Sequence, residues 1–503
     1  MGRAAGLGIS AAVATSFAAN GAFADEKPKK GGHLILGLDG ASSTDNLDPI
    51  TYVVTFQYTL GYQWGNSLVE LTENGGLSPE LAESWEPDPT ATKWVFKLRK
   101  GVEFHNGKEL TTDDVLYTLN YHRGPDSKSP AKAFFEPVAD IKATGKHEFV
   151  LTLKAPNADA PYIFSDYHLL MMPDKGDPKA GMGTGGYAIE SFQPGVKAVT
   201  KRNPNYWKDE RAFVDSIETI GLNDPTARLN ALQSGAVHFI NRVDPKIVPL
   251  LKSSGRVKVV DVPSAGYYCF PMRCTIPPFD NKDLRLALKY AMDRKKMIKL
   301  ILGGYGVEGN DHPVSSLDRF YAADIPQHSY DPDKARFHYQ KSGHSGDIGL
   351  KVTDGAFPGA VGAATIYRED AAKAGITINI DRVPDDGYWS DVWLKAPFCA
   401  SYWAGRPTAD MMMALSYLST APWNESDWKR PEFDKLLIQA RGELDNTKRK
   451  QMYRELQAMI SDDAGVIVPM FNDYLFGSVN NLTGLKPTPV FVGYRIAEQL
   501  HFT

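Results

Sequence analysis

The feature of this chain that most limits its possible folds is the way strand-like and helix-like segments take turns along it. Gly32 to Leu38 is an apolar run typical of a buried strand, and residues 94–99 and 148–154 show the alternating polarity of strands. Helical patterns with capping residues come between and after them, from about residues 111, 224, 283 and 446. We therefore predict an α/β protein with open, mostly parallel sheets and more than one lobe.

The helix ends are marked by specific residues. Asp224 and Pro225 open one helix, because an aspartate caps free amides and a proline lacks only an amide that has no partner there. A longer helix is expected from Asp283 to the glycine pair at 303–304. The helix over 446–460 has Met452, Leu456 and Met459 on one face, which we expect to pack into a core.

Length and charge exclude several classes of protein. The chain has 503 residues, of which 43% are apolar, so two or three packed units are expected. Its net charge is −4, and the charges are interspersed with no basic cluster that would neutralise a run of phosphates. Nucleic acid is therefore excluded as a partner.

The first 24 residues have the pattern of an export signal. Arg3 precedes a stretch of small and apolar residues, and Ala22-Phe23-Ala24 forms an A-x-A cleavage site before Asp25. The alternative, a membrane anchor, lacks a basic flank that would stop transfer. A single arginine is a short basic region, so a start upstream of Met1 with a twin-arginine signal stays open. No later segment has about 18 consecutive apolar residues, which predicts a soluble protein after export.

The three cysteines do not indicate a metal centre or a lipid anchor. Cys269 and Cys274 are five residues apart and can pair in an oxidising compartment, which would leave Cys399 free. A zinc site would require a second close pair or nearby histidines. No metal and no cofactor are expected.

Catalytic and nucleotide-binding motifs are absent or incomplete. The glycines of 181–186 satisfy G-x-G-x-x-G, but a strand-like segment follows where a pyrophosphate site needs a helix. Residues 101–108 have five residues between the glycines where a phosphate loop has four. His147-Glu148 lacks the second histidine of a zinc protease, and no G-x-S-x-G elbow occurs. An enzyme is not expected; a secreted hydrolase with scattered catalytic residues is the alternative from another class.

The segments 81–86 and 94–115, which include Phe104-His105-Asn106-Gly107, form the most distinctive sequence block of the chain. This block closely resembles the extracellular solute-binding protein family 5, whose members serve ABC importers of peptides, glutathione and nickel. Residues 183–187 resemble the family's G-T-G-P-Y turn with glycine in place of proline. Further similar blocks are 202–207, 232–237 and 278–294.

The resemblance implies a periplasmic-binding-protein-like fold of type II, in which two lobes close on a ligand and the first lobe has an extra subdomain. It implies no enzymatic activity, a periplasmic location, a monomer, and delivery of the ligand to ABC permease subunits with their ATPases. By analogy, after the signal at 1–24, the first lobe covers 25–50, 186–262 and 477–503, the extra subdomain 51–185, and the second lobe 263–476. Proline- and glycine-rich residues 173–186 and 263–278 are expected at boundaries or hinge crossings.

The resemblance also suggests ligand-binding residues. Peptide binders of the family have an aspartate shortly after a tryptophan, which pairs with the peptide ammonium group; here Arg406 stands three residues after Trp403. An arginine prefers a carboxylate, so a peptide-like solute with an exposed carboxylate is favoured, and a sugar or a metal chelate is the alternative. The alternative is that Arg406 is held by a protein carboxylate such as Asp410 or points to solvent. The other candidates are Trp403 for stacking, Asp410 for an amine, backbone amides at Gly185 and Gly186, and Arg273 as a second cation.

Overall fold

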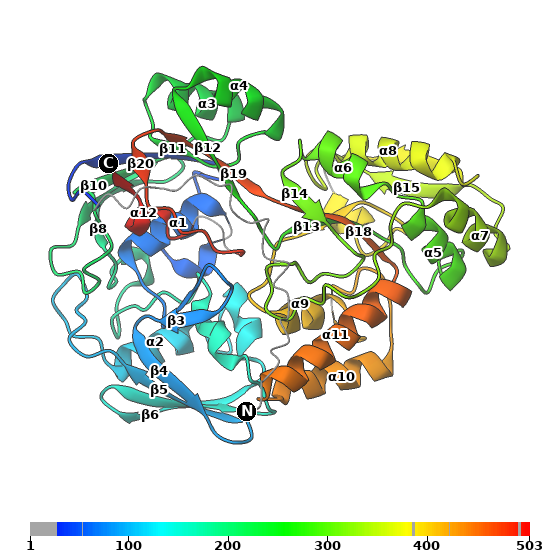
Figure 1. Ribbon diagram of the computed structural model, residues 1–503. Coiled ribbons are helices and arrows are strands. Elements are labelled where there is room, and N and C mark those ends of the chain that lie inside the picture. Colours follow the sequence, from blue (N-terminus) through cyan, green and yellow to red (C-terminus); the bar gives the residue numbers. More distant parts are fainter. Residues whose placement is uncertain (1–27, 53, 385–387, 422, 491–493) are drawn as a thin grey trace, which may run out of the picture.

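The computed structural model describes residues 28–52, 54–384, 388–421, 423–490 and 494–503 (Figure 1). The export signal and its cleavage site lie outside these ranges. The chain forms two lobes with an extra subdomain below the first, and the two lobes stand side by side in Figure 1. Within the described ranges no helix is long and apolar enough to cross a membrane.

The first lobe is built on one mixed sheet. Within the described ranges it has seven strands in the order β12-β19-β11-β1-β10-β9-β8. Strand β1 pairs in parallel with both of its neighbours, β10 and β11, and the other pairings of this sheet are antiparallel. The strands are β1 (His33–Leu38), β8 (Tyr187–Gln193), β9 (Lys197–Arg202), β10 (Ser216–Gly221), β11 (Phe239–Ile240), β12 (Val257–Val262) and β19 (Tyr474–Val479), and the helices are α1 (Thr55–Trp64), α3 (Pro225–Ser234), α4 (Val248–Ser254) and α12 (Ile496–Gln499).

The second lobe has an antiparallel sheet, in the order β14-β18-β13-β17, and a separate parallel pair, β15 and β16. Helices α5, α6 and α8 pack with both sheets around one apolar core, and α9, α10 and α11 share a second core on the other face. The strands are β13 (Tyr267–Pro271), β14 (Gly306–Glu308), β15 (Ile348–Val352), β16 (Ile378–Arg382), β17 (Ser401–Trp403) and β18 (Val466–Asn472), and the helices are α5 (Lys282–Tyr290), α6 (Arg294–Ile301), α7 (Pro332–Ser342), α8 (Ala360–Ala372), α9 (Ala409–Ser416), α10 (Pro431–Gly442) and α11 (Asn446–Asp463).

The extra subdomain is an antiparallel sheet, β4-β5-β7-β6, with α2 against it and its own apolar core. Helix α2 begins as expected, since Thr111 and Asp114 form a capping box at its start. The elements are β4 (Ala82–Pro87), β5 (Lys93–Leu98), β6 (Val138–Gly145), β7 (Glu148–Leu153) and α2 (Thr112–Arg123), with the small pairs β2 (Val69–Leu71) and β3 (Leu77–Pro79), and β20 (Leu482–Thr483) and β21 (His501–Phe502), nearby in the first lobe.

The prediction of mostly parallel sheets is wrong. Strands β8 and β9 are joined by a tight turn at Pro194 and Gly195, where Gly195 has a φ of 73°, and such a short connection forces antiparallel pairing. Strand β19 returns from the second lobe and enters between β12 and β11. Apolar periodicity reports which residues are buried and carries no information on strand direction.

Some of the helix predictions are confirmed, and others are wrong in the extent of the helix or in the burial of its residues. Asp224 caps α3 as expected, and its side chain accepts a hydrogen bond from the amide of Ala227. The single helix expected from residue 283 to 303 is two helices, because Asp293 caps a new start at α6. On α11, Leu456 is buried as predicted, but Met452 and Met459 only flank the core.

Two chain crossings join the lobes. Residues 263–266 lead from β12 to β13, and Asp473 leads from β18 back to β19. The first crossing lies within the proline- and glycine-rich segment at 263–278. Strand β19 begins at Tyr474, three residues before the predicted start of the last first-lobe segment.

All three cysteines are free, so the pairing considered for Cys269 and Cys274 is not formed. Cys269 is buried in β13, where its thiol donates a hydrogen bond to the carboxylate of Glu425 over 3.3 Å. Cys274 lies beyond the end of the same strand, and the four residues between the two cysteines are largely extended and keep the two sulfur atoms apart.

Candidate functional site

Five tyrosines from the two lobes lie near one another where the lobes meet. Tyr58 of α1 and Tyr167 have ring centroids 5.0 Å apart on the side of the first lobe and its subdomain. Tyr268 of β13 and Tyr402 of β17 are opposite each other in the second-lobe sheet, and Tyr474 stands at the second crossing. None of the five is fully buried. We call these five residues the tyrosine cleft.

The pKa values of these tyrosines are affected by groups from both lobes. Burial raises the pKa of Tyr268 to about 12, and Tyr474 and first-lobe Arg242 also act on it. Burial likewise raises the pKa of Tyr58, which has Tyr474 and Arg242 among its neighbours. The phenols of Tyr268 and Tyr58 are therefore neutral at neutral pH and can donate hydrogen bonds to a solute or accept them from it.

Arg242 and Asp39 form an ion pair on the first-lobe side of the cleft. Their Nη1 and Oδ2 atoms are 2.8 Å apart, and the Asn241 side chain donates to the other carboxylate oxygen over 2.6 Å. Arg242 has a φ of 52°, in the left-handed region that residues other than glycine seldom adopt. Such strain is typical of functional sites, because the surrounding structure must hold it in place.

Arg406 lies in the turn after β17 and points into the interlobe region. Its Nη1 donates to the carbonyls of Ala404 and Gly405, over 3.0 and 3.3 Å, and within the described ranges it pairs with no carboxylate. Burial lowers its pKa, while Tyr167 and Asp166 across the interface oppose that shift. A guanidinium removed from water without a two-point acceptor favours an incoming carboxylate.

A small cavity of about 20 Å³ borders Arg406, which is room for one water molecule and too little for a solute. A hollow of about 530 Å³ lies beside α8 and β16, and one of about 610 Å³ lies along α2. The first is lined by the second lobe alone and the second by the extra subdomain alone. We therefore place the candidate site between the lobes, where both contribute side chains. The small cavity is lined by Asn74, Gly75, Ala265, Leu317, Asp318, Arg319, Arg406, Pro407, Pro489 and Val490.

Trp403 is buried, with 5% of its surface exposed, and faces the core that includes α9 and α11. Its indole nitrogen donates to Glu425 over 2.8 Å, and Ser401 and Trp393 donate to the same carboxylate over 2.8 and 2.6 Å. Burial raises the pKa of Glu425, although these donors oppose the shift. The exposed neighbour on β17 is Tyr402, because successive side chains of a strand point to opposite faces.

Asp410 and Arg273 are both engaged by other side chains. Asp410 accepts two hydrogen bonds from Nε of Arg441, over 3.0 and 3.1 Å, so it does not neutralise Arg406. Arg273 pairs with Asp427 over 2.5 Å at the end of β13 that is farther from the first crossing. The structure thus groups Arg406 with the cleft and places Arg273 away from it.

Gly185 and Gly186 are buried where α1 meets the first-lobe sheet. The amide of Gly185 donates to the carbonyl of Trp64 over 2.9 Å, and a Cβ atom at Gly185 would lie 2.4 Å from that residue's backbone. A Cβ atom at Gly186 would lie 2.7 Å from the side chain of Ala212. Close packing explains why glycine occurs at both positions.

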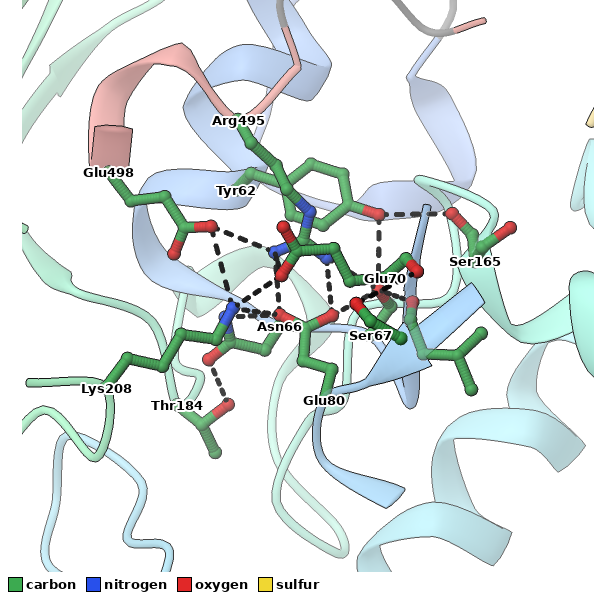
Figure 2. Close-up of polar contacts among 12 residues, drawn as sticks. Tyr62, Asn66, Ser67, Glu70, Glu80, Ser165, Thr184, Lys208, Arg495 and Glu498 are labelled. Carbon is green, nitrogen blue, oxygen red and sulfur yellow. Dashed lines mark hydrogen bonds and ion pairs between the residues drawn. The ribbon is translucent and has the colours of Figure 1, made fainter. Parts of the chain in front are cut away.

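A buried charge cluster joins the extra subdomain to the first lobe (Figure 2). Arg495 contacts Glu80 over 2.7 Å and Glu498 over 3.1 Å, and Lys208 contacts Glu80 over 3.0 Å. Three carboxylates face three cations, so the cluster is balanced without a ligand, and it holds the two parts as one body. Its members are Glu70, Glu80, Lys208, Arg211, Arg495 and Glu498.

Sequence reasoning missed the tyrosine cleft and the Asp39–Arg242 pair. These residues are separated by up to several hundred positions, and no local motif marks them. The one available signal was the richness in tyrosine, 23 residues, which by itself does not separate core from cleft.

Comparisons with known proteins agree with this architecture. The model of the family "Bacterial extracellular solute-binding proteins, family 5 Middle" matches residues 76–425. Heme-binding protein A of Haemophilus influenzae is 26% identical over 79% of this chain and 80% of its own. Di/tripeptide-binding protein 3 of Pseudomonas aeruginosa is 25% identical over 84% of this chain and 88% of its own.

Solved structures show the same fold. The ABC transporter substrate-binding protein CtaP of Listeria monocytogenes superposes with a TM-score of 0.84, at 21% identity, over 94% of this chain and all of the other. The periplasmic binding protein AgaA of A. tumefaciens R10, in complex with agropinic acid, has a TM-score of 0.77 at 21% identity, over 94% and 99% of the two chains. The chain belongs to the family 5 extracellular solute-binding proteins, and its fold is their two-lobe α/β fold.

Proposed function

We propose that this chain is the periplasmic receptor of an ABC importer and captures a peptide-like solute that bears a carboxylate. Arg406 supports the proposal most directly, because it lies half-buried between the two lobes and, among the residues that the structure describes, forms no ion pair; Asp166 acts on it only electrostatically. The tyrosine cleft supplies neutral donors and acceptors around it. Family membership and the relatives that bind dipeptides and oligopeptides support the transport role.

Capture follows from the two crossings. Rotation about residues 263–266 and Asp473 brings the lobes together, and a solute that touches both lobes favours the closed form. The closed form is then recognised by the permease, whose ATPase subunits drive import. The chain itself performs no chemistry and works as a monomer.

Location and domain limits are part of the same proposal. Cleavage after Ala24 releases the protein into the periplasm. The proposed limits are 25–50, 186–262 and 477–503 for the first lobe, 51–185 for the extra subdomain and 263–476 for the second lobe, except that α1 and the first residues of β19 count with the first lobe, on whose sheet and core they lie. Buried Gly185 and Gly186 help to shape the first lobe, and Trp403 supports the cleft from beneath; Asp410 and Arg273 stay secondary candidates.

Mass spectrometry of the solute released from natively purified protein tests this function. We expect a small carboxylate-bearing compound that is recovered unchanged after prolonged incubation with the protein. Conversion of that compound into a product would support a secreted hydrolase instead. A sugar without an acid group, or a metal chelate, would keep the receptor role and overturn the assignment of Arg406.

A further inference from the structure

Four aromatic side chains form a continuous group at the edge of the second lobe. Trp389 contacts Tyr402 and Trp393, with ring centroids 5.4 and 5.7 Å apart, and Trp393 contacts Trp423 over 6.1 Å. Trp389, Tyr402 and Trp423 are 39%, 49% and 40% exposed. We call these four residues the aromatic rim. Adjacent exposed rings of this size mark binding surfaces, because folding normally removes them from water.

A buried carboxylate holds the rim in place from beneath. Glu425 accepts the indole N–H of Trp393 over 2.6 Å and that of Trp403 over 2.8 Å. Trp403 in turn lies 6.0 Å from the ring of Trp423. Glu425 and Trp403 are 6% and 5% exposed, so these contacts belong to the packed interior. The exposed rings therefore rest on a fixed support, which reduces the entropy lost when a ligand binds.

The rim continues directly into the tyrosine cleft. Tyr402 belongs to both, since it touches Trp389 on one side and stands opposite Tyr268 in the sheet on the other. Arg406 follows Tyr402 by four residues, in the turn where β17 ends, and Tyr402 is among its electrostatic neighbours. A solute held by Arg406 thus has the rim beside it.

The geometry favours a planar ring over a cation. Neighbouring rings meet at centroid distances of 5.4 to 6.1 Å and at angles of 60° to 76°, so they touch each other and leave no space for an ion among them. The carboxylate of Glu425 is already occupied by donors from Cys269, Trp393, Ser401 and Trp403. Exposed ring surfaces that are fixed in this way suit stacking against a flat apolar group.

We propose that the aromatic rim is a subsite that stacks a planar ring of the solute whose carboxylate is bound by Arg406. This inference rests on the proposed receptor function and narrows its substrate class to aromatic or heteroaromatic acids. Tyr402 and Trp423 are its specificity-determining residues.

Four acids that share one carboxylate and differ in side chain test the subsite: N-acetyl-L-tryptophan, N-acetyl-L-phenylalanine, N-acetyl-L-leucine and N-acetyl-L-alanine. In titration calorimetry of the ligand-free protein, we expect the tryptophan derivative to bind at least about tenfold more tightly than the alanine derivative. The leucine derivative should lie near the alanine derivative, because its side chain is apolar without being planar. The phenylalanine derivative should have an affinity between those of the leucine and tryptophan derivatives.

Variants then assign the preference to the rim. Trp423→Ala should reduce binding of the tryptophan derivative about three- to tenfold and leave the alanine derivative unchanged. Tyr402→Ala should reduce binding of the tryptophan derivative more than that of the alanine derivative, because Tyr402 also belongs to the tyrosine cleft. Tyr402→Phe keeps the ring and should keep the wild-type ratio between the two affinities. The matched control is Phe337→Ala, which removes an exposed aromatic ring, 60% exposed, from α7 outside the rim.

Several results would overturn the subsite. Equal affinity for all four acids, or an equal loss of affinity for all four in Trp423→Ala, would show that the rim only covers the edge strand β17. The proposed receptor function would not be affected by that result. A sugar acid such as glucuronate that binds more tightly and depends on the same rings would reassign the rim to sugar stacking. Competition by tetramethylammonium would reassign it to cations. If none of the four acids binds at millimolar concentration, the subsite is refuted, and the released native solute still decides the receptor function separately.

Discussion

A charged contact at the end of the interface opposite the crossings should stabilise the closed form. Asp159 of the extra subdomain accepts two hydrogen bonds from Arg449 of α11, over 2.6 and 3.1 Å, and one from Arg319 over 2.5 Å. Asp159 and Arg449 are 4% and 2% exposed. Figure 1 shows α10 and α11 on the side of the second lobe that faces the subdomain, with the crossing strands at the other end.

The expected size of the effect follows from these contacts. Loss of one partner from a buried ion pair typically costs about 3–5 kcal/mol. Arg449 keeps a hydrogen bond from its Nε to the carbonyl of Ala440, and the side chain of Arg319 is 37% exposed and open to water. We therefore expect Asp159→Ala to cost the closed form about 2–3 kcal/mol. Opening separates the pair and hydrates both groups, so the open form should lose little.

A ligand that binds the closed form then loses affinity by the same free energy, about 30- to 150-fold. Titration calorimetry with the released native solute measures this change, and X-ray scattering measures whether the lobes close. Arg454→Ala is the matched control, because Arg454 lies on the same helix and its one ion pair among the described residues is with Asp324 of its own lobe, at 2.6 Å. Wild-type affinity in Asp159→Ala, or a ligand-free melting temperature lowered by more than about 5 °C, would show that this contact does not form on closing.

Three further outcomes are expected. Asp261 and Asp473 share the hinge region, and burial together with Asp261 raises the pKa of Asp473 to about 7. The stability contributed by the protonated form of Asp473 is lost as the pH rises through about 7. In thermal melts, Asp473→Asn should therefore be more stable than the wild type by about 1 kcal/mol at pH 8 and no more stable at pH 4. Arg495→Met should cost about 3–5 kcal/mol in urea unfolding, since it leaves three buried carboxylates of the charge cluster with two cations, Lys208 and Arg211. Arg336→Ala on the surface should cost under about 1 kcal/mol. Amino-terminal sequencing of protein released by gentle periplasmic extraction should begin at Asp25, and a protein retained in membranes with its first 24 residues would disprove the export signal.

Features with a local cause were predictable from the sequence. The caps at Thr111 and Asp224 satisfy amides within three residues of themselves, so the starts of α2 and α3 needed no tertiary information. The break at Asp293 was equally local but was hidden, because the apolar stripe continues across it. The two-lobe fold came from the resemblance, since no periodicity distinguishes the antiparallel pairings of the first-lobe sheet from parallel ones.

Features with a distant cause were not predictable. Trp403 was expected to face a ligand, but its partner Glu425 lies 22 residues away and the alternation of β17 turns Tyr402 outward instead. Asp410 was a possible partner of Arg406 until Arg441, 31 residues later, proved to hold it. The environment of a side chain in a cleft depends on chain segments that meet only after folding.

Titration of the purified, ligand-stripped protein with its own released solute tests the central claim, that Arg406 binds a carboxylate, most directly. Arg406→Ala should weaken binding by at least about tenfold and leave the ligand-free melting temperature nearly unchanged, since within the described part of the chain Arg406 donates only to the carbonyls of Ala404 and Gly405. Arg406→Lys should recover part of the affinity, because an ammonium group cannot make the planar two-point contact. The amide or ester of the solute should bind the wild type as weakly as the acid binds Arg406→Ala. Equal binding of acid and neutral analogue, or wild-type affinity in Arg406→Ala, would contradict the assignment of an anionic solute to this cleft.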